Sequence, residues 1–150
     1  MGEAGQGGGS GPVRRGPLVY GADAWVGPWL EGQIPGFRYD GAPTIGVIRG
    51  RELVAGLIYQ HHNGIHCEMG IAALPGRQWA DRTVLRGIFH YPFVELGCVC
   101  VTALVAASNL RSLNLCTKLG FEGEAVVRFA APDQGDVLVL KLWRDKCGWI

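Results

Sequence analysis

The segment from Cys98 to Arg128 constrains the fold more than any other part of the chain. It opens with Cys98 to Ala106, an uncharged run of small and β-branched residues that is long enough for one strand. Because neither face of this run carries a charge, the pattern predicts a strand buried on both faces, in the middle of a sheet. A second strand is expected to begin at Phe121.

The residues between these two strands predict a short helix. Ser108 or Asn109 supplies a side-chain oxygen that can cap a helix start, and Gly120 is typical of the left-handed position that ends a helix. The helix is therefore predicted over Leu110 to Leu119. On a helical wheel Ser112 and Cys116 face inward together, which fits either a functional pair or a hydroxyl bonded to the helix backbone beside a packed thiol.

A series of short motifs follows from the start of this helix to residue 149. It consists of Asn109-x-x-Ser112, Lys118-Leu119-Gly120-Phe121, Glu122-Gly123-Glu124, Arg128, Asp136 and Cys147-Gly148-Trp149. The series resembles the second half of the GNAT superfamily of acyl-CoA-dependent N-acyltransferases. It is most similar to the branch that acetylates protein N-termini and to small phage-encoded relatives. A weaker match spans residues 18 to 150, and it implies a single α/β domain.

Composition excludes several classes of protein. A chain of 150 residues fits one domain and can bury a self-sufficient core. Charged residues make up 18% of it and the net charge is +1, so it lacks the strong basic field of a protein held mainly by phosphate contacts. Nucleic acid binding is unsupported by this balance.

Cysteine usage and hydropathy indicate the compartment. The five cysteines form no CxxC pair, and the N-terminal residues do not resemble a signal peptide. No apolar run reaches the roughly 18 residues that a membrane-spanning helix needs. We expect a soluble cytoplasmic protein with reduced thiols, located in the host cytoplasm if the chain is phage-encoded.

The first part of the chain predicts a tail and two weak elements. Residues 1–17 are mostly Gly with Pro and Ser, a composition that favours a flexible tail, so the domain is placed at 18–150. Leu18 to Tyr20 is expected to form a short strand. Asp23 to Ile34 has nearly helical apolar spacing, but Gly27 and Pro28 in its middle predict a broken helix.

The central part predicts an antiparallel meander followed by a long helix. Strands are expected at Thr44 to Ile48, Leu53 to Tyr59 and Ile65 to Ala73, the last pair joined by the hairpin dipeptide Asn63-Gly64. Apolar spacing then predicts a main helix over Arg77 to Gly97 that kinks or ends near Pro92.

The helix leads into the Cys98 strand, which predicts a parallel neighbour for the third strand. Two further strands are expected at Glu124 to Ala131 and Val137 to Trp143. The fold class is therefore α/β, a GNAT-like mixed sheet of six or seven strands with flanking helices.

The resemblance implies a site for acetyl-CoA at the N-terminus of the main helix, where free N–H groups bind phosphate. GNAT proteins place Arg or Gln there, followed by small glycines. This chain has Arg77 in register, but Ala80 and Arg82 stand where the glycines are expected. Either the two arginines bind the phosphates directly, or the cofactor site has decayed.

Acetyl transfer requires a group that takes the proton of the attacking amine. Glu68 is the candidate, because it is a carboxylate on an otherwise apolar strand and shares a face with His66. The matching GNAT strand often carries such a Glu. The open alternative is an exposed carboxylate at a sheet edge.

The leaving thiolate and the thioester oxygen also need donors. Ser112 matches the Ser of the N-terminal acetyltransferase branch, and Cys116 stands where many members have Tyr, so both are candidate acids. Asn109 would bind the cofactor arm or simply cap the helix. The resemblance implies that the thioester oxygen is bound by backbone N–H groups in a gap between two splayed strands, and the residues concerned are Met69, Gly70, Ile71 and Ala72.

A metal site is not predicted. His61, His62, His66 and Cys67 lie close together in sequence, but strand alternation separates His61 from His62, and the spacing matches no standard zinc pattern.

These residues lead to an acetyl-CoA-dependent N-acetyltransferase that acts on a primary amine. The acceptor stays open between a protein N-terminus, a small molecule and a modified base, and a homodimer stays open as well. One alternative is a binding module with the same fold and a degraded phosphate loop. Another, suggested only by the phage relatives, is an enzyme that acylates aminated DNA bases.

Overall fold

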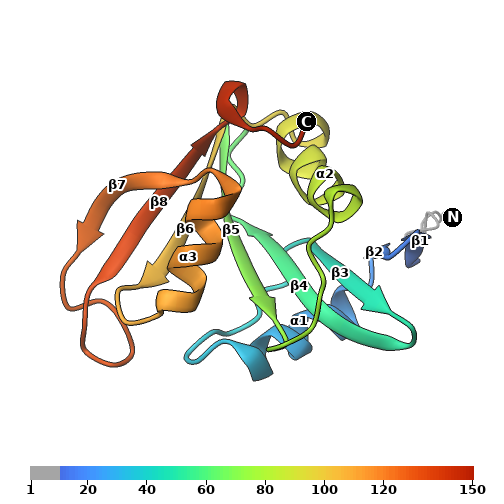
Figure 1. Cartoon of the computed structure of the whole chain (residues 1–150), viewed down its shortest axis with the longest axis horizontal. Coiled ribbons are helices and arrows are strands. Elements are labelled where there is room, and N and C mark those ends of the chain that lie inside the picture. The colour runs from blue at the N-terminus through green and yellow to red at the C-terminus, as the bar shows by residue number, and fades with distance from the viewer. Residues whose placement is uncertain (1–10) are drawn as a thin grey trace, which may run out of the picture.

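The computed structural model describes residues 11–150, which form one mixed sheet flanked by helices (Figure 1). The strand order is β1-β2-β3-β4-β5-β6-β8-β7, and every neighbouring pair is antiparallel except β5 and β6. The strands are β1 (Val13–Arg15), β2 (Leu18–Tyr20), β3 (Thr44–Arg49), β4 (Glu52–Gln60), β5 (His66–Ala73), β6 (Cys100–Ala106), β7 (Glu122–Val127) and β8 (Val137–Trp143). The helices are α1 (Asp23–Gln33), α2 (Arg82–His90), the π-helical turn η1 (Tyr91–Glu95), α3 (Leu110–Leu119) and the 3₁₀ turn η2 (Arg144–Lys146).

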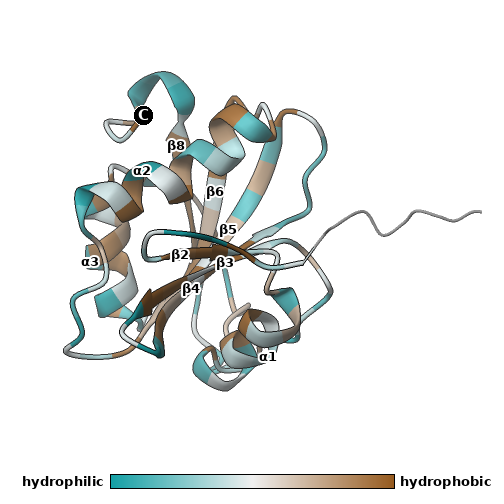
Figure 2. Ribbon diagram, turned by 90° about the vertical axis from the view of Figure 1, so that its right-hand side faces the viewer, coloured by the Kyte–Doolittle hydropathy of each residue, from teal (hydrophilic) through white to brown (hydrophobic). Residues whose placement is uncertain are grey.

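The helices cover the two faces of the sheet unequally. Figure 2 shows α1 on one side, and α2 and α3 on the other. The larger core lies under α2, η1 and α3, with Phe89 and Phe93 fully buried against the sheet, and the smaller core lies under α1 around Val26 and Leu30. The α1 core involves β2 to β5, so the other end of the sheet is bare on that face.

The predicted meander and the predicted helix over Leu110–Leu119 are confirmed. Observed β3, β4 and β5 agree with the predicted ranges within one residue at each end, and Asn63 Oδ1 accepts hydrogen bonds from the N–H groups of Ile65 and His66 at the hairpin. Asn109 caps α3 and Gly120 ends it at a φ of 106°. The parallel pairing of β5 with β6 is also as predicted.

The N-terminal prediction is wrong in part. Val13–Arg15 fall within the predicted flexible tail, yet they pair with β2 and raise the described sheet to eight strands instead of six or seven. Composition hid this strand because its pairing depends on a neighbour and not on burial: all three residues are exposed. The remainder of that prediction falls largely on residues 1–10, which lie outside the described residues.

Helix α1 is continuous, although Gly27 and Pro28 predicted a break. Val26 and Leu30 are fully buried against the sheet, and this packing outweighs the hydrogen bond that Pro28 cannot make. Gly27 packs so closely on the ring of Tyr39 that an added Cβ would lie 2.5 Å from it. Close packing therefore requires a small residue at position 27, where helix propensity alone predicted a break in the helix.

Helix α2 is shorter than the predicted Arg77–Gly97 helix. It begins at Arg82 because the Asp81 side chain caps it, accepting a hydrogen bond from the Val84 N–H at 2.9 Å. It ends at His90, in line with the break predicted near Pro92, and continues as η1. The Ile88 carbonyl, which Pro92 cannot satisfy for lack of an N–H, accepts a hydrogen bond of 2.7 Å from the hydroxyl of buried Tyr59.

Strand β6 is not buried on both faces as predicted. It starts at Cys100, and Leu104 in its middle is 53% exposed. The reason is that α1 does not reach this half of the sheet, so one face of β6 borders open space. None of the helices in residues 11–150 combines the length and the apolar character needed to span a bilayer.

Candidate active site

The central feature of the site is a gap between the two parallel strands. Pairing of β5 with β6 is confined to three residue pairs, from His66 with Cys100 to Glu68 with Thr102. Beyond these, β5 stays paired with β4 and β6 with β8, and they no longer pair with each other. The predicted splay is therefore present, and a cleft of about 870 Å³ opens there.

The cleft is lined mainly by β5, β6 and the start of α3, with further residues from the end of α1, β4, the loop before α2, the β7–β8 loop and the start of β8. Of the predicted site residues, those that line it are Glu68, Met69, Gly70, Ile71, Ala72, Asn109, Ser112 and Cys116. Arg77, Ala80 and Arg82 are not among the lining residues. One cleft thus brings together β5 and the start of α3, the two segments that carry the predicted catalytic residues.

Glu68 and Ser112 enter the cleft from opposite faces of the sheet. Met69 is buried in the core beneath α2 and α3, so its neighbour Glu68 points to the α1 face. Ser112 lies on α3, on the other face, and is half-buried. The cleft therefore connects the two faces where the strands have parted.

The partner of Glu68 is His61, not the predicted neighbour His66. His61 Nδ1 lies 2.7 Å from Glu68 Oε2, while His66 Nε2 lies 2.8 Å from the Thr102 hydroxyl. Strand alternation could not reveal this, because His61 adopts a left-handed backbone conformation with φ of 56° directly after β4. Residues 11–150 contain no group of three or more His, Cys, Asp or Glu side chains placed to hold a metal ion.

The start of α3 places its polar groups toward the cleft. Asn109 Oδ1 accepts a hydrogen bond of 3.1 Å from the Ser112 N–H, so the capping role is real and the amide nitrogen of Asn109 is left for other partners. Cys116 is buried one turn further along, and burial raises the pKa of its thiol to about 11. A thiol this weakly acidic stays protonated at neutral pH.

The backbone of β5 presents hydrogen-bonding groups to the gap. The Leu74 N–H donates to the carbonyl of Val54 in β4, and the Ile65 carbonyl accepts from the N–H of Val99, which precedes β6. Since the N–H and C=O of one strand residue point to the same side and successive residues alternate, Ile71 points toward β6. Pairing has ended before Ile71, so its N–H faces the cleft. Of the four predicted residues, Met69 and Ile71 therefore point toward β6, and Ile71 lies further beyond the last pair, Glu68 with Thr102.

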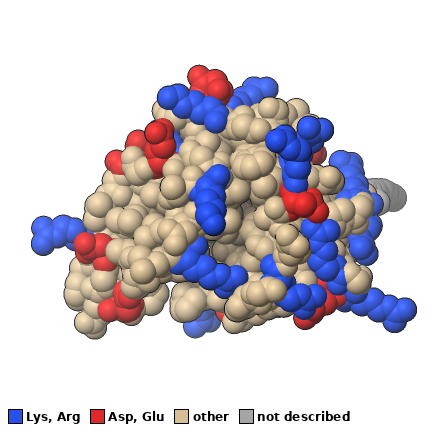
Figure 3. All heavy atoms as spheres, in the orientation of Figure 1, with Lys and Arg blue, Asp and Glu red and all other residues tan. Residues whose placement is uncertain are grey.

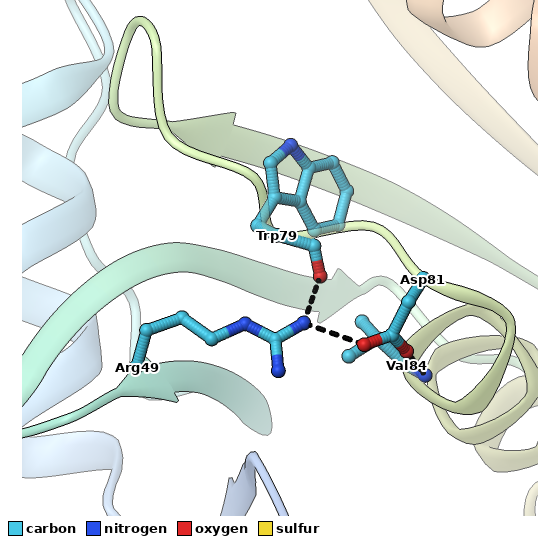
Figure 4. Close-up of polar contacts among 4 residues, drawn as sticks. All are labelled: Arg49, Trp79, Asp81 and Val84. Atoms are coloured by element: carbon cyan, nitrogen blue, oxygen red, sulfur yellow. Dashed lines mark hydrogen bonds and ion pairs between the residues drawn. The ribbon is translucent and has the colours of Figure 1, made fainter.

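The loop before α2 is held by Arg49 at the end of β3 (Figure 4). Arg49 Nη2 donates to the Trp79 carbonyl at 3.1 Å and to Asp81 Oδ2 at 2.7 Å. The Val84 N–H and then the Arg49 guanidinium lower the pKa of Asp81. A carboxylate of the chain itself therefore occupies the N-terminus of α2, where the sequence predicted bound phosphate.

The predicted phosphate ligands lie beside this loop. Arg77 forms an ion pair with Glu52 at the start of β4, Ala80 packs at the edge of the core, and Arg82 is the exposed first residue of α2. Figure 3 shows basic side chains gathered over the β3–β4 hairpin and α2. Trp79 is buried and lines the cleft, as a packing anchor should.

A hydrogen bond between two side chains links the turn before α3 to the β7–β8 loop at the cleft. The Ser108 hydroxyl donates to Asp133 Oδ2 at 2.6 Å and lowers the pKa of Asp133, which ties the turn before α3 to the β7–β8 loop. Both residues line the cleft. Sequence reasoning missed this contact because the two residues are 25 positions apart.

Comparison with known proteins identifies the fold. No protein-family model and no curated protein sequence matches the chain. Among solved structures, a mutant of the spermidine N-acetyltransferase SpeG from Vibrio cholerae is similar over 72% of this chain and 68% of its own, with 20% identity and a TM-score of 0.61. The Campylobacter jejuni N-acetyltransferase PseH, solved with acetyl coenzyme A, is similar over 70% of each chain, with 19% identity and a TM-score of 0.55. The chain has the fold of the GNAT N-acetyltransferases.

Proposed function

We propose that the chain is an acetyl-CoA-dependent N-acetyltransferase that acts on a primary amine by direct attack on the thioester. The observation that carries the proposal is the cleft between β5 and β6, lined by Glu68 from one face of the sheet and by Ser112 from the other. The GNAT fold of two named N-acetyltransferases supports the same reaction. Acetyl-CoA, when bound, supplies the acetyl group as an activated thioester.

The residues of the cleft have separate roles in this reaction. Glu68 takes the proton of the acceptor ammonium, so that the nitrogen lone pair becomes available. The Ile71 N–H donates to the thioester oxygen, where negative charge develops during attack. The Ser112 hydroxyl donates a hydrogen bond to the departing sulfur.

Cys116 is poorly suited to protonate the departing thiolate. Ser112 can stabilise that thiolate with a hydrogen bond. Transfer of a proton from a thiol of pKa about 11 to a thiolate whose conjugate acid has an ordinary pKa of about 8.5 is uphill. A hydrogen bond from Ser112 stabilises the thiolate without complete proton transfer.

The phosphate end of the site fits acetyl-CoA less completely. Asp81 holds the N-terminus of α2, and Arg77 is paired with Glu52. Arg82 and the arginines of the β3–β4 hairpin supply positive charge there. We assign phosphate binding to Arg82 first and to Arg77 after release from Glu52.

The presence of Asp81 at the N-terminus of α2 also favours the alternative function, a binding module with the same fold and no catalytic activity. Calorimetric titration with acetyl-CoA, followed by chromatographic detection of CoA release with spermidine or a short peptide as acceptor, separates the two. The enzyme is expected to bind acetyl-CoA and release CoA, and Glu68→Gln is expected to bind it equally while releasing CoA at least 100-fold more slowly. A folded protein that does not bind acetyl-CoA would refute the enzyme.

The acceptor is proposed only as an amine. The protein N-terminus favoured by the motif around Ser112, a polyamine and an aminated DNA base of a phage are distinguished by offering each in the same assay. A cytoplasmic location, in the host if the gene is phage-borne, fits a supply of acetyl-CoA.

A further inference from the structure

The contact between His61 and Glu68 joins an exposed imidazole to a shielded carboxylate. The His61 side chain is 67% exposed and that of Glu68 27%. A carboxylate can only accept hydrogen bonds, so a neutral His61 must carry its proton on Nδ1 and donate it to Glu68 Oε2. This bond fixes one oxygen of the carboxylate and leaves Oε1 for a partner in the cleft.

The backbone of His61 is shaped to make this contact. Gln60 is the register partner of Glu68 and shares its face of the sheet. Because side chains alternate along a strand, an extended His61 would point to the opposite face, away from Glu68. The positive φ of 56° breaks the alternation and brings the ring back over β5. Uncommon backbone conformations of this kind are characteristic of functional sites.

We infer that His61 is a positioning residue for Glu68 in the proposed acetyl transfer, holding the carboxylate with Oε1 directed at the acceptor amine. The inference rests on the proposed function. During transfer an N–H bond of the acceptor ammonium breaks, its electron pair stays on nitrogen, and an O–H bond forms at Oε1. That proton then leaves to water at the mouth of the cleft. The nitrogen lone pair forms a C–N bond to the acetyl carbon, the C–S bond breaks, and the second proton on nitrogen leaves with the CoA thiolate as the free thiol.

The other polar groups around His61 have partners of their own. Asp40 Oδ2 accepts a hydrogen bond of 3.0 Å from Gln60 Nε2, and the pKa of Asp40 is lowered first by the Ala42 N–H and then by Gln60, with His61 the last of the causes. His66 faces Thr102 instead. Glu68 is therefore the carboxylate that His61 contacts.

Three variants test the role. His61→Ala removes the donor, whereas His61→Asn keeps a donor at the position of Nδ1, tolerates positive φ and cannot be protonated. His62→Ala changes the adjacent exposed histidine and serves as the matched control. Circular dichroism establishes folding, and kcat and KM are measured with spermidine, with a short peptide and with an aminated base as acceptors.

We expect His61→Ala to lower kcat about tenfold with an unchanged KM for acetyl-CoA. His61→Asn should restore kcat to within about threefold of the wild type, and His62→Ala should match the wild type. Equal kcat for His61→Ala and wild type, or failure of folded His61→Asn to restore activity, overturns the positioning role alone. A wild type that binds acetyl-CoA and acetylates none of the three acceptors, spermidine, a peptide N-terminus and an aminated base, overturns the proposed function, and the role with it.

Discussion

Arg49 and Asp81 join the end of β3 to the start of α2 through a contact of 2.7 Å between Nη2 and Oδ2. The same Arg49 nitrogen binds the Trp79 carbonyl, so one side chain fixes both the loop and the helix cap. The pair is exposed at the surface and by itself contributes about 0–1 kcal/mol. Its significance is positional: it keeps a negative charge at the helix end that best accommodates an anion.

Replacement of that charge should improve cofactor binding. Asp81→Asn retains an oxygen that can cap the helix but removes the repulsion between the carboxylate and a phosphate. We expect the Kd for acetyl-CoA to fall about twofold to fivefold, equivalent to about 0.3–1 kcal/mol for one charge at a helix end in low salt. Titration calorimetry at low and high salt measures it. Weaker binding by a variant of unchanged Tm would mean that Asp81 supports the cofactor.

Asp81 also predicts how stability depends on pH. Its pKa is lowered in the folded chain, so its contribution is present above the unfolded value of about 3.9 and disappears as the pH falls through the folded value. Thermal melts of the wild type should therefore lose stability faster than those of Asp81→Asn below about pH 4. Parallel melting curves across pH 3 to 6 would contradict the assignment.

Ser112 and Cys116 should differ in their effects on transfer. Ser112→Ala removes the proposed donor to the departing sulfur and is expected to lower kcat at least tenfold, with KM for acetyl-CoA little changed. Cys116→Ala should lower kcat less than threefold, at some cost in stability because the thiol is buried. Rate measurements at saturating acetyl-CoA decide, and the reverse order would make Cys116 the acid.

Two glycines of α1 form a matched pair for testing its packing. Gly27→Ala would place a Cβ 2.5 Å from the Tyr39 ring and should destabilise the fold by about 1–3 kcal/mol. Gly32→Ala meets no atom within 4 Å in the same helix and should stabilise it by about 0.5–1 kcal/mol. Urea denaturation measures both. Similar free energies of unfolding for the two variants would show that the Tyr39 ring moves aside at little cost.

Local signals in the sequence were sufficient for much of the fold. The bounds of α3 follow from Asn109 and Gly120, whose caps depend on neighbours within a few residues. The β4–β5 hairpin follows from Asn63-Gly64 in the same way. The resemblance to GNAT proteins, rather than a local signal, suggested that Glu68 and Ser112 border one gap, and both line the cleft.

The remaining features depend on contacts between distant residues. The start of α2 is set by Asp81 together with Arg49, 32 positions earlier, and Val13–Arg15 form a strand only because β2 offers an edge. The role of His61 depends on a backbone angle that residue type alone does not determine. These are the points at which tertiary packing overrides local preference.

All five cysteines are buried and unpaired. Burial raises the pKa values of Cys67, Cys98, Cys116 and Cys147, so little reactive thiolate is present near neutral pH. A cysteine introduced on the exposed surface would then be the main target for a maleimide dye. Dyes can therefore be attached at two introduced surface cysteines to measure distances across the cleft in single molecules, without first replacing the native cysteines.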